Sequence, residues 1–167
     1  MCKTMKSLRG VAVLLAGTLA VLALGTGVAS AATNGTNRPL EGSGTLTGPT
    51  DASGNYDVTG LTVQSHLGRT MVEVVGNLNS ASFVATLTAA NGDTYTSVPV
   101  SALTPSNVCP ALPNGIFNVP YHIVQAIIGG TGRFAGASGS IDTTGCFGLD
   151  TAGNLTITFT DEGTITY

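Results

Sequence analysis

The chain has 167 residues, of which nine are acidic and six are basic, and only 9% of its residues are charged. This length suits a single globular domain. Three of the six basic residues lie within the first nine positions, so the rest of the chain holds three arginines, no lysine and all nine acids. Because so few cations cannot neutralise phosphates, we do not expect nucleic acid or an anionic membrane surface as a partner.

The N-terminus has the pattern of a cleaved export signal. Lys3, Lys6 and Arg9 precede an uncharged run rich in Val, Leu and Ala at 11–28, which ends in the small residues Ala-Ser-Ala at 29–31. This order is typical of a bacterial signal-peptide helix that is removed after export. A permanent membrane anchor is the alternative, since about 20 apolar residues span a bilayer. Glycines within the run and the lack of a positive cluster behind it favour cleavage.

These observations predict a secreted, extracellular protein that has no membrane contact once the signal is removed. The expected organisation is a signal peptide at 1–31, a flexible segment at 32–40 and one β-domain at 41–167. Gly, Thr, Asn and Ser interrupt the β-domain every few residues, and no window shows helical spacing of apolar residues. Alternation of apolar and polar residues is typical of strands instead.

We expect about eight strands, which follow one another along the chain. They are predicted at 44–47, 58–67, 70–76, in a hairpin over 82–100 that turns at 91–93, at 119–128, at 134–142, and in the final segment 155–167. Pro99 predicts that the second hairpin strand ends there or lies at an edge, because proline donates no ladder hydrogen bond. Closure into a barrel removes the exposed edges of an open sheet, so we predict an all-β, eight-stranded antiparallel barrel.

The final segment has the clearest alternation. Leu155, Ile157, Phe159, Ile165 and Tyr167 share one parity, and threonines occupy most of the other. One face of this strand is therefore expected to be buried. The run Asp-Glu-Gly at 161–163 interrupts the pattern and predicts a bulge or bend.

Two cysteines follow the leader, Cys109 in a proline-rich loop at 103–118 and Cys146 in the C-terminal part. In an oxidising compartment they are expected to form a disulfide, with two independent thiols as the alternative. If 119–128 and 134–142 are adjacent strands, both cysteines lie near one end of the barrel. The bond would then hold the loop over one mouth of the barrel.

The stretch 129–139 is a glycine-rich turn. Gly129, Gly130, Gly132 and Gly136 permit a sharp reversal with close backbone approach. The spacing also fits a dinucleotide-binding loop, but that site needs a following helix, and the neighbouring pattern is strand.

The sequence GGTGRFAGA at 129–137 resembles a signature of small secreted bacterial proteins, which are in turn similar to allene oxide cyclase and dirigent-type barrels. Segments 66–69, 90–93 and 163–167 add to this resemblance. It implies an eight-stranded antiparallel barrel with a hydrophobic interior that holds a small reactive molecule. No catalytic residue of those families can be matched onto this chain.

Few side chains are candidates for chemistry. His66, Glu73 and His122 are the candidate acid–base groups, and Arg69 and Tyr121 are candidate ligand-binding groups. The structural alternatives are histidines at the surface and an ion pair between Arg69 and Glu73. The sequence shows no metal-binding spacing and predicts no cofactor.

Three functions therefore remain open. The chain could be a secreted barrel that binds a small apolar molecule or a cell-envelope component, a cofactor-free isomerase or cyclase, or a structural or adhesive envelope protein. A cavity that contains His66, Glu73 or His122 would favour the enzyme. An apolar cavity without them would favour the binding protein, and a filled barrel would favour the structural role. The oligomeric state is not predicted.

Overall fold

The computed structural model of the protein describes residues 35–106 and 119–167. These residues form eight strands and one short 3-10 helix, η1. The elements are β1 (Asn37–Pro49), β2 (Asn55–Gln64), β3 (Gly68–Asn77), β4 (Ser82–Ala89), β5 (Thr94–Pro99), β6 (Val119–Gly130), η1 (Gly132–Phe134), β7 (Ser138–Leu149) and β8 (Asn154–Thr166). The predicted signal peptide lies outside the described residues.

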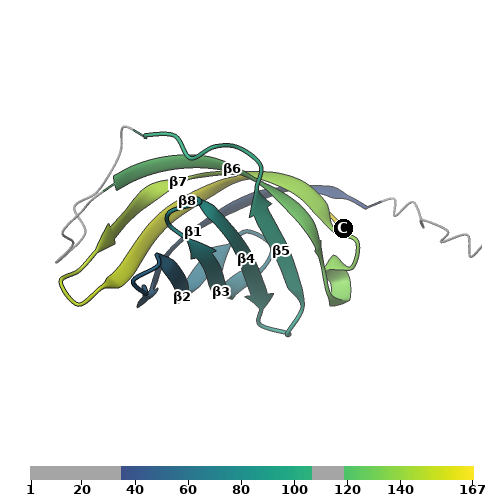
Figure 1. Ribbon diagram of the computed structural model, residues 1–167. Coiled ribbons are helices and arrows are strands. Elements are labelled where there is room, and N and C mark those ends of the chain that lie inside the picture. Colours follow the sequence, from purple (N-terminus) through teal and green to yellow (C-terminus); the bar gives the residue numbers. More distant parts are fainter. Residues whose placement is uncertain (1–34, 107–118) are drawn as a thin grey trace, which may run out of the picture. The chain divides into compact units, whose positions relative to one another are not determined.

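The eight strands form a closed antiparallel barrel in which each strand pairs with its neighbours along the chain (Figure 1). The barrel closes through a long pairing of β1 with β8, from Asn37 opposite Thr166 to Pro49 opposite Asn154. Closure removes the unpaired strand edges that an open sheet would expose. The prediction of an all-β, eight-stranded antiparallel barrel is confirmed.

The first strand is longer than its sequence predicts. The segment expected to be flexible, 32–40, contains the start of β1 at Asn37, and Leu40 is buried in the core. The residues opposite Asn37 and Leu40 are Thr166 and Gly163 of β8, which lie at the far end of the chain. A local pattern that contains Pro39 shows no alternation, so this pairing could not be recognised from nearby residues.

The strand predicted at 134–142 is displaced along the chain. Gly132–Phe134 forms η1, and β7 runs from Ser138 to Leu149. The Gly- and Thr-rich second half of β7 has weak alternation, yet it pairs on one side with β6 and on the other with β8. Pairing on both sides explains why this half is a strand despite its composition.

The predicted hairpin is confirmed. β4 and β5 pair antiparallel around the Asn91-Gly92-Asp93 turn, where Gly92 has a φ of +87° that favours glycine. The second hairpin strand ends at Pro99, as expected from the missing proline donor.

The chain beyond β5 continues beside β6. The backbone N–H of Val100 donates to the carbonyl oxygen of Val124 at 2.9 Å, and Thr104 forms a backbone bridge with His122. This path carries Leu103 to the barrel interior, where it lines a cavity. Residues 35–106 and 119–167 contain no helix of the length and hydrophobicity needed to cross a bilayer.

Candidate functional site

The two ends of the barrel differ. We call the end with the turns 50–54 and 78–81 the cavity end, and the opposite end, with the turns 65–67 and 90–93, the filled end. The filled end is closed by Phe134 of η1, which is 1% exposed. Its ring contacts those of Tyr95 and Tyr167 edge-on, with centroids 5.8 and 4.7 Å apart. Aromatic packing therefore plugs this end.

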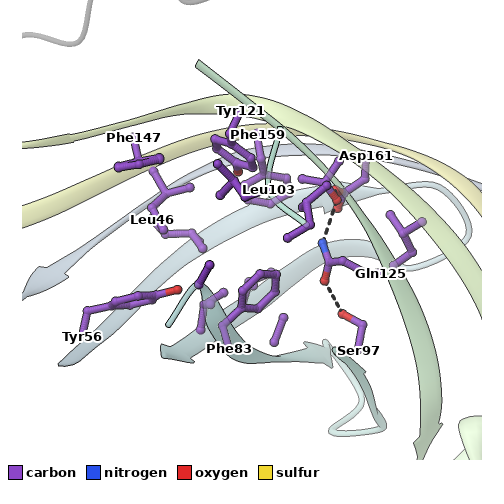
Figure 2. Close-up of a pocket in the computed structure, with 18 of the residues that line it drawn as sticks. Leu46, Tyr56, Phe83, Ser97, Leu103, Tyr121, Gln125, Phe147, Phe159 and Asp161 are labelled. Atoms are coloured by element: carbon purple, nitrogen blue, oxygen red, sulfur yellow. Dashed lines mark hydrogen bonds between the residues drawn. The ribbon is translucent and has the colours of Figure 1, made fainter. Parts of the chain in front are cut away.

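The cavity end holds a cavity of about 180 Å³, to which all eight strands contribute. Most of its lining is aliphatic or aromatic, which is typical of sites for small apolar ligands. The aromatic side chains among its described lining residues are Tyr56, Phe83, Tyr121, Phe147 and Phe159, which Figure 2 labels. They are brought together because each occupies an inward-facing position of its strand.

Local geometry makes room for these rings. Tyr56 lies opposite Gly76 in the register, and an added Cβ at Gly76 would come within 2.6 Å of the Tyr56 hydroxyl. The missing side chain at Gly76 therefore lets the Tyr56 ring extend across the neighbouring strand. Tyr121 lies opposite Gly145 on β7, where an added Cβ would meet the backbone of Thr158 on β8 and not the tyrosine ring.

The floor of the cavity is polar and centres on Asp161, which is 5% exposed. The Thr143 hydroxyl donates to Asp161 Oδ1 at 2.7 Å, and the Gln64 amide donates to Oδ2 at 3.3 Å. Both carboxylate oxygens therefore accept a hydrogen bond from the wall of the barrel.

The hydrogen bonds around Asp161 extend across the barrel. Gln125 Nε2 donates to Thr143 at 2.7 Å, and Ser97 donates to Gln125 Oε1 at 2.8 Å (Figure 2). On the other side, the Tyr95 hydroxyl donates to Gln64 Oε1 at 3.1 Å. The donors on both branches point toward Asp161. Buried polar groups connected in this way escape the cost of being left unpaired.

Burial raises the pKa of Asp161 to about 6, because the apolar surroundings disfavour the charged form more than the hydrogen bonds from Thr143 and Gln64 favour it. Burial also raises the pKa of Tyr56 to about 12 and moves that of Tyr121 above its usual range. The negative charge of Asp161 adds to the shift at Tyr121. Only Asp161 among these three changes its charge near neutral pH.

Asp161 is the residue that sequence reasoning misses. The pattern predicts a bulge at 161–163, but β8 is continuous from Asn154 to Thr166 and pairs with β1 throughout. Asp161 therefore keeps the parity of Phe159 and points inward. The sequence signal that could have identified Asp161 is its position, because it alternates in step with the apolar residues of an otherwise regular strand.

Four of the five predicted site residues lie outside the cavity. His66 occupies the turn between β2 and β3 with a φ of +62°, and Arg69 and Glu73 are exposed on β3. His122 is on the outer face of β6, where its Nε2 lies 2.8 Å from Asp142 Oδ1. No ion pair among the described residues joins Arg69 to Glu73. The candidate acid–base groups His66, Glu73 and His122 are therefore not among the described residues that line the cavity.

Tyr121 is the one predicted site residue that lines the cavity. It is 7% exposed, its ring lies 6.0 Å from that of Phe147, and its hydroxyl makes no hydrogen bond to the described residues. The structure thus brings together Tyr121 and Asp161.

The predicted turn glycines connect β6 to β7 at the filled end. Gly129, Gly132 and Gly136 have φ values of +138°, +57° and +77°. Gly130 has an ordinary φ, but an added Cβ there would meet the backbone oxygen of Thr94. These glycines therefore hold η1 and its Phe134 plug in place and do not reach the cavity.

Cys146 is fully buried on β7, and Cys109 lies outside the described residues, so the disulfide stays a prediction. Gly145 and Phe147 face the interior, so alternation directs Cys146 to the outer side of the barrel. The expected position of the loop over one mouth of the barrel depends on Cys109 and its neighbours, which lie outside the described residues.

The part of the chain that the structure describes contains no group of three His, Cys, Asp or Glu side chains that could hold a metal ion. Comparison of the chain with protein-family models, with curated proteins and with solved structures finds no match in any of the three.

Proposed function

We propose that this protein binds a small apolar molecule inside its barrel. The observation that carries the proposal is the cavity of about 180 Å³, which is lined mainly by aliphatic and aromatic side chains and has one polar floor. An engineered apolar cavity of about 150 Å³ in another protein holds benzene. The cavity therefore suits a ligand with one six-membered ring and a short substituent.

The competing functions make different demands on the interior. A structural or adhesive role needs a barrel filled along its whole length, whereas here only the filled end is packed by Phe134 and its neighbours. An enzyme that uses His66 or His122 needs these side chains in the cavity, and they lie outside it. The binding function uses the cavity as it stands and needs neither histidine.

The proposed site of action is outside the cell. The basic residues, apolar run and small residues at 1–31 support export by a cleaved signal peptide. The ligand would then be a molecule of the medium or of the cell envelope. The expected disulfide between Cys109 and Cys146 fits the same oxidising compartment.

Native mass spectrometry tests this proposal. The protein is purified from the culture medium of its own host, and its mass is measured before and after unfolding. We expect a retained small molecule that is released on unfolding, and a rise in melting temperature when toluene is added to the emptied protein. Absence of any bound mass together with no response to toluene would contradict the proposal.

A cofactor-free isomerase or cyclase is the second candidate, because Asp161 and Tyr121 place a titratable carboxyl and a phenol hydroxyl in one apolar cavity. The resemblance of 129–137 to allene oxide cyclase and dirigent-type proteins supports the same candidate. The test is to add the molecule recovered from the native protein back to the emptied protein. Conversion that Asp161→Asn abolishes would favour the enzyme, and unchanged recovery of the molecule would favour the binding protein.

A further inference from the structure

Asp161 is a buried acid without a cationic partner among the described residues. The ion pairs between these residues join His122 to Asp142 and Arg133 to Asp93, and both involve other acids. No Lys, Arg or His is among the described residues that line the cavity. Thr143 and Gln64 donate hydrogen bonds to the carboxylate but bring no positive charge. An ionised carboxylate in apolar surroundings is costly unless a counter-charge accompanies it.

The aromatic lining complements a cation. Phe83, Phe147 and Phe159 present rings to the same cavity as Tyr56 and Tyr121 (Figure 2). The face of an aromatic ring attracts an ammonium group, and aromatic cages are a recurrent device for organic cations. The Tyr121 hydroxyl has a further use, because it makes no hydrogen bond to the described residues and its oxygen can accept one from an ammonium N–H beside Asp161.

We propose that the natural ligand of this cavity is a protonated amine on an apolar body the size of one ring, with its ammonium group on Asp161 and its hydrocarbon among the aromatic side chains. This inference rests on the proposed binding function and names the chemical class of its ligand. The excess of nine acids over three arginines after the leader gives the domain a negative field that attracts cations. A neutral alcohol could donate one hydrogen bond to Asp161 but would leave its charge unbalanced.

Calorimetric titration with three molecules of similar size tests the proposal at pH 7.5. Benzylamine is the cationic probe, benzyl alcohol is the neutral donor, and toluene is the apolar reference. We expect the wild-type protein to bind benzylamine at least tenfold more tightly than either neutral probe. Asp161→Asn should abolish this preference and leave toluene binding in place. Asp142→Asn, which changes an exposed acid on the outer face, is the matched control and should keep the preference.

Proton release provides a second measurement that needs no variant. At pH 6 about half of the Asp161 carboxyls are protonated, so an ammonium ligand should expel up to about half a proton on binding, whereas toluene should expel none. The tyrosines that face Asp161 from inside the barrel, Tyr95 and Tyr121, have raised pKa values and stay neutral at this pH. Glu41 and Glu162 are exposed on the outer face. Titration in two buffers of different ionisation enthalpy measures the released proton.

The outcomes separate the two proposals. Toluene binding without a preference for benzylamine, or a preference that survives in Asp161→Asn, would overturn the amine inference and leave the binding function standing. Absence of proton release with benzylamine at pH 6 would overturn the amine inference as well. Failure of all three probes to bind would contradict the binding function itself.

Discussion

Gln64 and Asp161 lie two strands apart and meet over Gly42. In the register, Gly42 of β1 is opposite Gln64 of β2 on one side and opposite Asp161 of β8 on the other. Because Gly42 has no side chain, the Gln64 amide crosses β1 and donates to Asp161 Oδ2 at 3.3 Å. The polar floor of the cavity therefore depends on a glycine that makes no hydrogen bond to the carboxylate itself.

Gly42→Ala should destabilise the protein. An added Cβ would lie 2.7 Å from the Gln64 amide, so the amide must move away and the hydrogen bond to Asp161 is lost. A hydrogen bond to a charged group contributes about 1.5 to 3 kcal/mol, and we expect a loss of this order in the free energy of unfolding. Urea unfolding at pH 7 measures it. Ser43→Ala, at the exposed neighbouring position, is the control, and equal unfolding midpoints for the two variants would contradict the prediction.

The buried carboxyl of Asp161 should make stability fall as the pH rises. Its pKa is about 6 in the folded protein against 3.8 for an ordinary aspartate, so between these values the folded state binds more protons than the unfolded state. The contribution is fully present below about pH 4 and is lost as the pH passes about 6. The pKa difference corresponds to about 3 kcal/mol.

The measurement compares wild type with Asp161→Asn by urea unfolding from pH 4 to pH 7. Asp51 and Asp150, whose pKa values are lowered by hydrogen bonds to asparagines, are present in both proteins and cancel in the comparison. The free energy of unfolding of wild type relative to the variant should rise as the pH falls. A difference that stays constant over this range would show that Asp161 does not titrate between these values.

Much of the barrel could be predicted because its strands alternate regularly. Leu155, Phe159 and Ile165 share one parity and are all buried, as their spacing indicates. The Asn91-Gly92-Asp93 turn and the end of β5 at Pro99 follow from the conformations that these residues permit. The predicted strand boundaries are wrong where the pairing partner is distant in the chain, as at Asn37. They are also wrong in β7, because its glycines and threonines obscure the alternation of apolar and polar residues.

The candidate site was harder to predict because it is created by the register. Gln64, Thr143 and Asp161 lie on three different strands, and each looks like an isolated polar residue in the sequence. Only closure of β1 on β8 brings Gln64 within reach of Asp161. The chemistry of His66 and His122 suits acid–base roles, but His66 lies in the turn between β2 and β3 and His122 lies on the outer face of β6.

Oxidised protein from the culture medium should contain no free thiol after cleavage of the leader. We expect Cys109 and Cys146 to form a disulfide. The bond would close a loop of about 37 residues, for which the chain-entropy model gives a stabilisation of about 4 kcal/mol. Thiol titration of the unfolded protein, before and after reduction, counts the cysteines, and urea unfolding with and without reductant measures the stabilisation. Two titratable thiols before reduction would contradict the pairing.

Filling the cavity should abolish toluene binding without unfolding the barrel. Ala85 lines the cavity, and Ala85→Phe would place a ring in the space proposed for the ligand. We expect toluene affinity to fall at least tenfold, because the ring and the ligand cannot occupy a cavity of about 180 Å³ together.

Val84→Phe is the matched control, since Val84 is the preceding residue of the same strand and points to solvent. Circular dichroism establishes that both variants fold, and calorimetry measures binding. Equal toluene affinity in the two folded variants would mean that toluene binds elsewhere on the protein, since only Ala85→Phe removes space from the barrel interior.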